Sequence, residues 1–430
     1  MARNIQPILN HVLQQIEPSQ KELSDIKKIV LDFTQKIKKI LKKQKIKAEI
    51  FIGGSFAKET MIKKEKYDVD IFLRFDSYNE KEISELTSEI TQDLDIGFSR
   101  IHGSRDYFNI KMSNNLSIEL IPVLKIQNPR EAKNITDLSY SHVNYMIKKL
   151  KNTKIRKEIM LAKAFCYANN SYGAESYING FSGYALELLI YYYKGFLKFI
   201  KAMSNSKISK KDKLIIDIEK HYKNKTLLLM DMNSSKLASP IILIDPTYKQ
   251  RNALSALSYE TFEKFKDVCK KFLKFPSIEF FKKKRLDFES LNKTANKKHA
   301  EIIILKLDTG RQEGDIAGSK LLKFYRFLNY EISKYFIVKD SGFEYNDKSS
   351  AVCYFLVNRK KVIIFQGPLI KQKENLKKFK KTHKKTFIKQ ARIFSKQKIN
   401  FSPQDFIKDW RAKSFQTMND MSITQLEVLD

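Results

Sequence analysis

One short stretch, FIGGSFAKETMIKKEKYDVDIFLRFD (51–76), limits what this chain can fold into. A strand that ends in two glycines and a serine is followed by a short helix (55–62) and by a second strand, DVDIFLRF (68–75). In an extended strand, residues i and i+2 point to the same side, so Asp68 and Asp70 share one face. The stretch therefore predicts a small α/β layer that carries two carboxylates side by side.

These two carboxylates require a positive partner, because like charges repel and are costly to remove from water. A lysine could fill that role, but Mg²⁺ fills it best, since it prefers oxygen ligands and binds carboxylates together with substrate phosphates. A third acid, Glu119, should turn to the same side, because its neighbours Ile118 and Leu120 face the core. Three such acids would complete a site for two magnesium ions.

The glycines suit a phosphate group. Gly53 and Gly54 expose backbone N–H groups where the short helix begins, which is a favourable place for an anion. Lys58, one turn later, adds positive charge. A merely solvated acidic edge would leave the two glycines unexplained.

The overall charge indicates a polyanionic partner. The chain of 430 residues has 81 Lys and Arg against 48 Asp and Glu, a formal net charge of +33. Nucleic acid is the default partner for such a chain, although a Lys-, Ile- and Asn-rich composition of the kind an AT-rich genome gives also raises the charge. Three widely spaced cysteines fit reduced thiols, and no long apolar segment occurs, so we expect a cytoplasmic protein without a membrane partner.

The pattern along the chain predicts an α+β multidomain protein of three parts. Residues 1–135 read as an α/β domain, and residues 136–275 read as helical, with an apolar helix over 182–203 as their core. Residues 276–430 read as a second α/β region with a basic tail. Lysines of that tail are candidates for RNA binding: Lys377, Lys378, Lys380, Lys381, Lys384 and Lys385.

Several segments together resemble one known family. GGSFAKET followed by DVDIF resembles the signature of the DNA-polymerase-β-like nucleotidyltransferases. TDLSYSHVNYM (136–146), LAKAFCYANNSYGAESYINGFSGYALELLI (161–190) and IDPTYKQRNALSALS (244–258) are similar to segments of the archaeal (class I) CCA-adding enzymes, which are tRNA nucleotidyltransferases. FQGPL and the basic helix after it resemble the end of that family, so the likeness spans nearly the whole chain. The RRD and EDxxR motifs of class II enzymes are absent.

The resemblance implies a role for each matching position. Asp68, Asp70 and Glu119 are implied as catalytic ligands of two Mg²⁺ ions. Contacts to the triphosphate and ribose are implied for Ser55, Lys58, His142, Lys163 and Tyr172, beside the backbone of Gly54. Arg251 is implied to read the incoming base together with the tRNA backbone.

This chain departs from the family pattern at three places. Lys58 stands where the family often has Arg, which replaces a bidentate phosphate fork by a point charge. Glu119 stands in place of the usual Asp and is one methylene longer. The loop 61–67 is one residue longer than usual.

The resemblance implies the addition of C, C and A to the 3′ end of tRNA from CTP and ATP, with tRNA as the partner and a homodimer as in many family members. Two alternatives remain. The GGS and DVD motifs alone would fit a poly(A) or poly(U) polymerase or an oligonucleotide synthase of the same superfamily. A catalytically silent RNA-binding relative is the alternative from another class.

Overall fold

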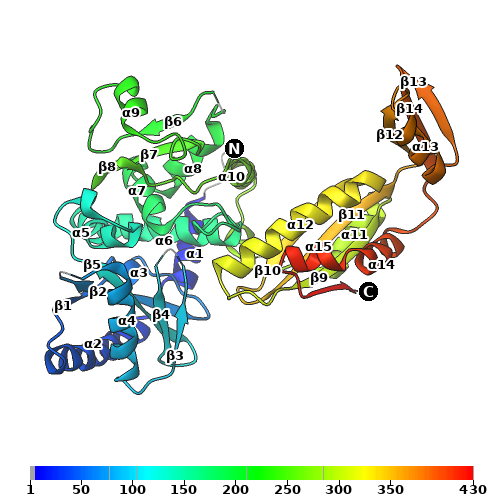
Figure 1. Ribbon diagram of the computed structural model, residues 1–430. Coiled ribbons are helices and arrows are strands. Elements are labelled where there is room, and N and C mark those ends of the chain that lie inside the picture. The colour runs from blue at the N-terminus through cyan, green and yellow to red at the C-terminus, as the bar shows by residue number, and fades with distance from the viewer. Residues whose placement is uncertain (1–4, 77, 104, 210, 284, 430) are drawn as a thin grey trace. The chain divides into compact units, whose positions relative to one another are not determined.

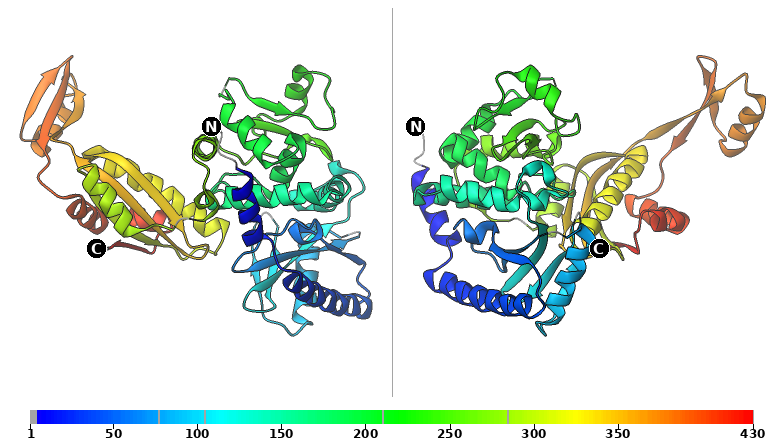
Figure 2. Two further views of the ribbon diagram at one scale, coloured as in Figure 1. Left: turned by 180° about the vertical axis from the view of Figure 1, so that it is seen from behind. Right: turned by 60° about the vertical axis from the view of Figure 1, so that its left-hand side comes forward.

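The structure, a computed structural model, describes residues 5–76, 78–103, 105–209, 211–283 and 285–429. The chain divides into two compact units, Met1–Lys284 and Arg285–Asp430 (Figure 1, Figure 2). Helices and sheets occur in both units, so the α+β prediction is confirmed. In the part of the chain that the structure describes, no helix is both long and apolar enough to cross a membrane.

The first unit opens with a five-stranded mixed sheet in the order β1-β2-β5-β4-β3. Its strands are β1 (Ala48–Ile52), β2 (Tyr67–Phe75), β3 (Phe98–Ile101), β4 (Tyr107–Lys111) and β5 (Leu116–Leu124). The pair β2 and β5 runs parallel, and the other neighbours are antiparallel. The sequence indicated every strand except β3, whose four residues lack the alternation of apolar and polar side chains.

Two helices, α2 (Gln20–Lys43) and α4 (Glu80–Gln92), pack against this sheet. α2 begins where Ser19 and Glu22 cap each other: the Ser19 side chain accepts from Glu22 N, and the Glu22 carboxylate accepts from Ser19 N. One side of α2 then buries apolar residues at intervals of three and four: Ile26, Val30, Phe33, Ile37 and Leu41. That stripe packs with Val69, Ile71 and Leu73 of β2, so the opposite face of β2 is left for the polar residues.

The rest of the first unit is mostly helical. It contains α1 (Gln6–Ile16), α5 (Ser139–Lys149), α6 (Thr153–Ala168), α7 (Gly183–Tyr193), α8 (Phe196–Asn205) and α10 (Tyr259–Lys274). Short 3₁₀ turns, Pro129–Glu131, Ile135–Leu138 and Ile278–Phe281, connect these parts. Figure 1 shows α1, near the start of the chain, beside α6.

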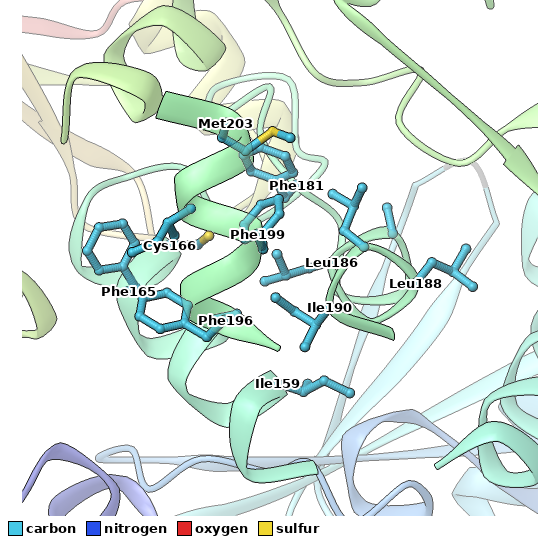
Figure 3. Close-up of a cluster of buried hydrophobic side chains, with 14 of the residues drawn as sticks. Ile159, Phe165, Cys166, Phe181, Leu186, Leu188, Ile190, Phe196, Phe199 and Met203 are labelled. Carbon is cyan, nitrogen blue, oxygen red and sulfur yellow. The ribbon is translucent and has the colours of Figure 1, made fainter. Parts of the chain in front are cut away.

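The core of these helices is dominated by phenylalanine rings and leucines from α6, α7 and α8 (Figure 3). A single helix over 182–203 is wrong, because the chain breaks between α7 and α8. Lys194 and Gly195 have φ angles of 56° and 134°, which end one helix and redirect the next. The backbone N–H of Phe196 then donates to the Glu158 carboxylate at 2.7 Å, which caps α8.

A small sheet interrupts the helical pattern that the sequence indicated for 136–275. Its strands are β6 (Leu214–Ile216), β7 (Ile241–Asp245) and β8 (Tyr248–Asn252), with α9 (Lys225–Asp231) between β6 and β7. β7 is buried along its whole length. A short buried run of this kind cannot be told from a helix segment by periodicity, which explains why the sequence did not reveal it.

The second unit holds two further sheets. A four-stranded antiparallel sheet has the order β10-β11-β9-β15, with β9 (Glu301–Asp308), β10 (Phe336–Tyr345), β11 (Ser350–Arg359) and β15 (Gln425–Leu429). Its helices are α11 (Phe288–Lys297), α12 (Asp315–Tyr335), α14 (Pro403–Lys413) and α15 (Phe415–Asp420). A three-stranded sheet has the order β12-β14-β13, with β12 (Val362–Leu369), β13 (Thr386–Lys389) and β14 (Arg392–Lys398), and α13 (Lys373–Thr382) packs on β12.

Replacing Phe165 by Ala should destabilise the first unit by about 3–5 kcal/mol, because a fully buried ring would leave a cavity. The Phe165 ring contacts four other phenylalanine rings at centroid distances from 5.3 to 6.0 Å. Urea unfolding followed by circular dichroism measures the loss. Phe275, which is 58% exposed, is the matched control, and its change to Ala should cost less than about 1 kcal/mol. Equal losses for the two variants would contradict this account of the core.

Candidate active site

The two glycines form a sharp connection between β1 and the short helix α3 (Gly54–Ala57). Gly54 has a φ of 61°, and a Cβ at this position would overlap the Asp70 Oδ2 atom. The backbone N–H of Gly53 donates to the Asp70 carbonyl at 2.9 Å, which ties the connection to β2. Only glycine fits at 54, because the conformation is left-handed and the space belongs to a carboxylate. The helix is shorter than the expected 55–62, since Glu59 turns to a φ of 54°.

The three carboxylates lie on one face of the sheet. In the parallel register of β2 with β5, Asp70 is opposite Glu119 and Asp68 is opposite Ser117. The Ser117 hydroxyl donates to Asp68 Oδ1 at 2.8 Å. The alternation of side chains along both strands therefore gathers the acids that the sequence singled out.

Burial and mutual repulsion raise the pKa values of two of these acids, Glu119 and Asp70. Burial raises the pKa of Glu119 to about 8, and the charges of Asp70 and Asp68 add to the effect. Burial likewise raises the pKa of Asp70, which the Lys58 ammonium opposes and the Asp68 charge reinforces. A cation beside these oxygens would relieve the repulsion.

The donor set suits a divalent cation, because all three side chains offer carboxylate oxygens. Within the described residues, no group of three or more His, Cys, Asp or Glu side chains is gathered closely enough to hold a metal ion. The acids thus share one face of the sheet and one pocket, but they do not by themselves form a complete coordination shell for a metal ion. That arrangement fits a cation that is held partly by its substrate.

A pocket of about 410 Å³ lies over the carboxylates. Its lining includes eight of the predicted residues: Gly54, Ser55, Lys58, Asp68, Asp70, Glu119, Lys163 and Tyr172. Other lining residues come from the loop before β2, from the connection between α6 and α7, and from the first half of α7, such as Thr60, Lys64, Glu175, Gly183, Tyr184 and Glu187. His142 and Arg251 are not among its lining residues.

Two of the lining lysines meet one glutamate that the sequence reasoning missed. Lys58 Nζ lies 2.6 Å from Glu187 Oε2, and Lys163 Nζ lies 2.8 Å from Glu187 Oε1. Burial alone would raise the pKa of Glu187, but Lys163 and Lys58 together lower it to about 2. Burial lowers the pKa of Lys58, and Glu187 opposes that change. The signal for Glu187 in the sequence was a single acid within the otherwise apolar run YALELLIYYY.

A second missed acid, Asp245, brings His142 and Arg251 together. His142 Nε2 lies 2.9 Å from one oxygen of Asp245, and Arg251 donates to the same oxygen at 2.7 Å. Tyr184 donates to the other oxygen at 3.0 Å, and its ring stacks on His142 at 4.1 Å. Burial lowers the pKa of His142, which leaves a neutral imidazole beside an ionised carboxylate and a guanidinium. Of these four residues, Tyr184 lines the pocket. Through Tyr184 the Asp245 network borders the pocket, and we call this network the layer behind the pocket.

The hydroxyl of Tyr172 lies close to the first residue of α7. Gly183 is the first residue of that helix, and a Cβ there would lie 2.9 Å from the Tyr172 hydroxyl oxygen. Burial raises the pKa of Tyr172, so its hydroxyl stays protonated. Glycine at 183 therefore lets the start of α7 approach the tyrosine closely.

The lysines predicted to bind RNA lie in the second unit. Four of them are exposed on α13, and two follow it before β13: Lys377, Lys378, Lys380, Lys381, Lys384 and Lys385. α13 has one acidic residue, Glu374, in its first turn and basic residues in its last turn. The exposed surface of this helix is thus strongly positive.

Comparison with known proteins agrees with this geometry. Residues 157–282 match the family model of the second domain of tRNA nucleotidyltransferase, and residues 4–158 match that of the Second Messenger Oligonucleotide or Dinucleotide Synthetase domain. The CCA-adding enzyme of Nanoarchaeum equitans is 32% identical over 404 residues, which cover 92% of this chain and 94% of the relative. The chain belongs to the CCA-adding enzyme family.

A further sequence relative and a solved structure are also similar to this chain. The CCA-adding enzyme of Methanocaldococcus jannaschii is 30% identical over 411 residues, which cover 93% of this chain and 88% of that protein. A solved structure of the Cid1 RNA terminal uridylyl transferase has a TM-score of 0.51 at 12% identity and covers 66% of this chain and 99% of its own. About two thirds of this chain therefore share the fold of that transferase.

Replacing Glu119 by Gln should stabilise the metal-free protein, and more so at high pH. The folded protein raises the pKa of Glu119 from 4.5 to about 8, so the stability of the wild type falls as the pH rises through this window. Gln has the same shape and cannot ionise. At about pH 9 the variant should gain at least ~1 kcal/mol, the equivalent of one pKa unit, and near pH 5 it should gain little.

Thermal unfolding in the presence of EDTA measures this gain at the two pH values. Glu89, an exposed acid of α4, provides the control, and its change to Gln should leave the stability nearly the same at both. A loss of stability in the Glu119 variant at high pH would show that folding does not raise the pKa of Glu119.

Proposed function

We propose that this chain adds C, C and A in turn to the 3′ end of tRNA from CTP and ATP, by nucleotidyl transfer with release of pyrophosphate. The family membership supports the reaction, and one observation supports its location: three carboxylates and a glycine-bounded pocket meet on one face of the first sheet. The likeness to a uridylyl transferase concerns the fold alone, so a poly(U) or poly(A) polymerase is not favoured.

Asp68, Asp70 and Glu119 are proposed to hold Mg²⁺ in a two-metal site. When bound, such ions activate the attacking 3′-hydroxyl and neutralise the charge of the departing pyrophosphate. The protein's own residues position the reactants. Gly54 and Ser55 offer backbone and hydroxyl donors to the phosphates, and Lys58, Lys163 and Tyr172 offset their charge. This division of labour suits phosphoryl transfer, which depends mostly on positioning and electrostatics.

The layer behind the pocket is proposed to handle the ribose and the base. Asp245 holds His142 and Arg251 on one carboxylate, and the Tyr184 ring joins this layer to the pocket. His142 is proposed to contact the ribose, and Arg251 is proposed to read the base. Because the Asp245 network fixes the guanidinium, Arg251 would present the same donors to every incoming nucleotide.

We further propose three functional parts: a catalytic domain (1–135), a helical nucleotide and tRNA domain (136–275) and a tRNA-binding region (276–430). The exposed lysines of α13 are proposed to contact the phosphates of the acceptor stem, whose A-form shape such contacts sense. A cytoplasmic homodimer, as expected from the family, completes the proposal.

A tRNA that ends at its discriminator base should gain two nucleotides from CTP alone and three from CTP with ATP. Replacing Asp70 by Asn should reduce this extension by about a thousandfold or more, because an interaction with a metal is worth several kcal/mol in the transition state. Sequencing gels of labelled tRNA measure both results. Filter binding should show that the Asn variant still binds tRNA.

The matched control is Asp76→Asn, which lies directly after β2 and outside the pocket lining and should extend tRNA normally. A long homopolymer from the wild type would move the protein to the poly(A) or poly(U) polymerases. No extension with tRNA still bound would indicate a silent RNA-binding relative.

Replacing Lys377, Lys378, Lys380 and Lys381 by Ala should weaken tRNA binding on the order of tenfold and make its salt dependence less steep. Each lost phosphate contact removes counterion release from the binding equilibrium. Titration of tRNA over a range of KCl concentrations measures the slope, and the KM for CTP should stay unchanged. Four exposed lysines of α2 are the control: Lys27, Lys28, Lys38 and Lys39. Equal salt slopes for the α13 variant and the wild type would remove α13 from the tRNA interface.

A further inference from the structure

Three charged side chains meet at the wall of the pocket, and they come from different parts of the chain. Lys58 follows α3 beside the sheet, Lys163 lies in the middle of α6, and Glu187 lies in α7. The carboxylate of Glu187 receives both ammonium groups, one on each oxygen, at 2.6 and 2.8 Å. The Glu187 side chain is fully buried, and those of the lysines are 8% and 3% exposed.

A fourth residue completes the arrangement. The Thr60 hydroxyl donates to Glu187 Oε1 at 3.1 Å and accepts from Lys163 Nζ at 2.8 Å. Thr60 is itself fully buried. Both oxygens of Glu187 thus accept hydrogen bonds, and their donors come from the connection between α3 and β2 as well as from α6.

Stability alone gives no reason for this cluster. A buried group of charges is often no more stable than well-packed apolar residues of the same size, because its desolvation offsets its attraction. The cluster also holds two like charges close together, and burial, reinforced by the charge of Lys163, lowers the pKa of Lys58. Its place is the informative feature, since both lysines and Glu187 line the pocket above the carboxylates.

We propose that Glu187 is a positioning residue for the triphosphate: its carboxylate holds the ammonium groups of Lys58 and Lys163 together on one wall of the pocket. The ligand chemistry that fits two fixed ammonium groups is a polyphosphate chain, independent of base and sugar. This inference rests on the proposed function, in which the two lysines contact the incoming nucleotide.

The physical advantage is preorganisation. Two free lysine side chains would repel each other and would have to be ordered when the nucleotide binds, at a cost in conformational entropy. Because Glu187 already holds both ammonium groups in the folded protein, they are ordered before the nucleotide binds. The cluster carries one net positive charge, so it still attracts an anion, and the phosphates meet donors that need no rearrangement.

The test is the change Glu187→Gln, which keeps the shape and removes the charge. Steady-state extension of tRNA should show a KM for CTP and for ATP raised about 10- to 100-fold, with kcat changed less than about threefold. Calorimetric titration of the protein with pyrophosphate in magnesium chloride should show the same fold-loss of affinity. Titration with CMP should be unaffected, since CMP lacks the β and γ phosphates.

Glu158→Gln is the matched control, because Glu158 is another hydrogen-bonded glutamate of the helical part, where it accepts the backbone N–H of Phe196, and it does not line the pocket. It should leave the KM values and the pyrophosphate affinity unchanged even where it lowers the melting temperature. A loss of stability without a KM effect in Glu187→Gln would make Glu187 a purely structural residue and overturn the proposal.

A double-mutant cycle with Lys163→Met tests whether Glu187 acts through the lysines. If it does, adding Glu187→Gln to Lys163→Met should raise the KM much less than it does in the wild type. Fully additive effects would overturn the proposal. If Glu187→Gln does not fold, Thr60→Val keeps all three charges and removes only the linking hydroxyl. That variant should raise the KM for CTP about threefold or more, and an unchanged KM would count against the proposal.

Failure of the inference and failure of the proposed function give different results. If the wild type extends tRNA and Lys163→Met raises the KM while Glu187→Gln does not, only the inference is wrong. If the wild type does not extend tRNA at all, the proposed function is wrong. Pyrophosphate titration then still decides whether Glu187 holds a polyphosphate site.

Discussion

The parallel pairing of β2 with β5 is the constraint on which the rest of the first unit depends. Its register sets Asp70 opposite Glu119 and leaves Val69, Ile71 and Leu73 to the core. A slip of one residue in either strand would turn its acids into the apolar core and its apolar residues into the pocket. The packing of α2 against the apolar face therefore also fixes the acids on the face that lines the pocket.

Local acidity inside a strongly basic protein becomes understandable from this arrangement. Positive charge on the outer surface attracts a polyanion over a distance of about one Debye length. Close to the reaction centre, attraction alone would be of little use, because the phosphates must be held in one place. Carboxylates on the sheet and the buried ammonium groups of Lys58 and Lys163 line the same pocket, so fixed charges of both signs are available there.

Local sequence features predicted most of the sheet and the acids, while long-range partners stayed hidden. Strand alternation placed Asp68 and Asp70 on one face, and the paired glycines indicated the tight connection, because both depend on a few neighbouring residues. Glu187 and Asp245 were missed, since their partners Lys58 and His142 lie 129 and 103 residues away. No single-sequence pattern reports such a pairing, which only the folded chain creates.

Breaks in regular structure were equally hard to foresee. The apolar run 182–203 reads as one helix, yet the chain leaves it at Lys194 and Gly195 because α8 must pack back on α6 and α10. Propensity favours a continuous helix there, and tertiary packing overrides it. The same holds for β7, whose burial on all sides removes the alternation that would identify a strand.

The missing side chain at position 54 has an evolutionary consequence. The volume that any larger residue would need is already filled by the Asp70 carboxylate, so the two positions behave as one inherited unit. In a relative without the acid at position 70, the steric reason for glycine at position 54 would be gone. Only the positive φ angle would still favour glycine there. Among relatives of this chain, a bulky residue at the second glycine therefore marks a lineage that has abandoned the chemistry and kept only the scaffold.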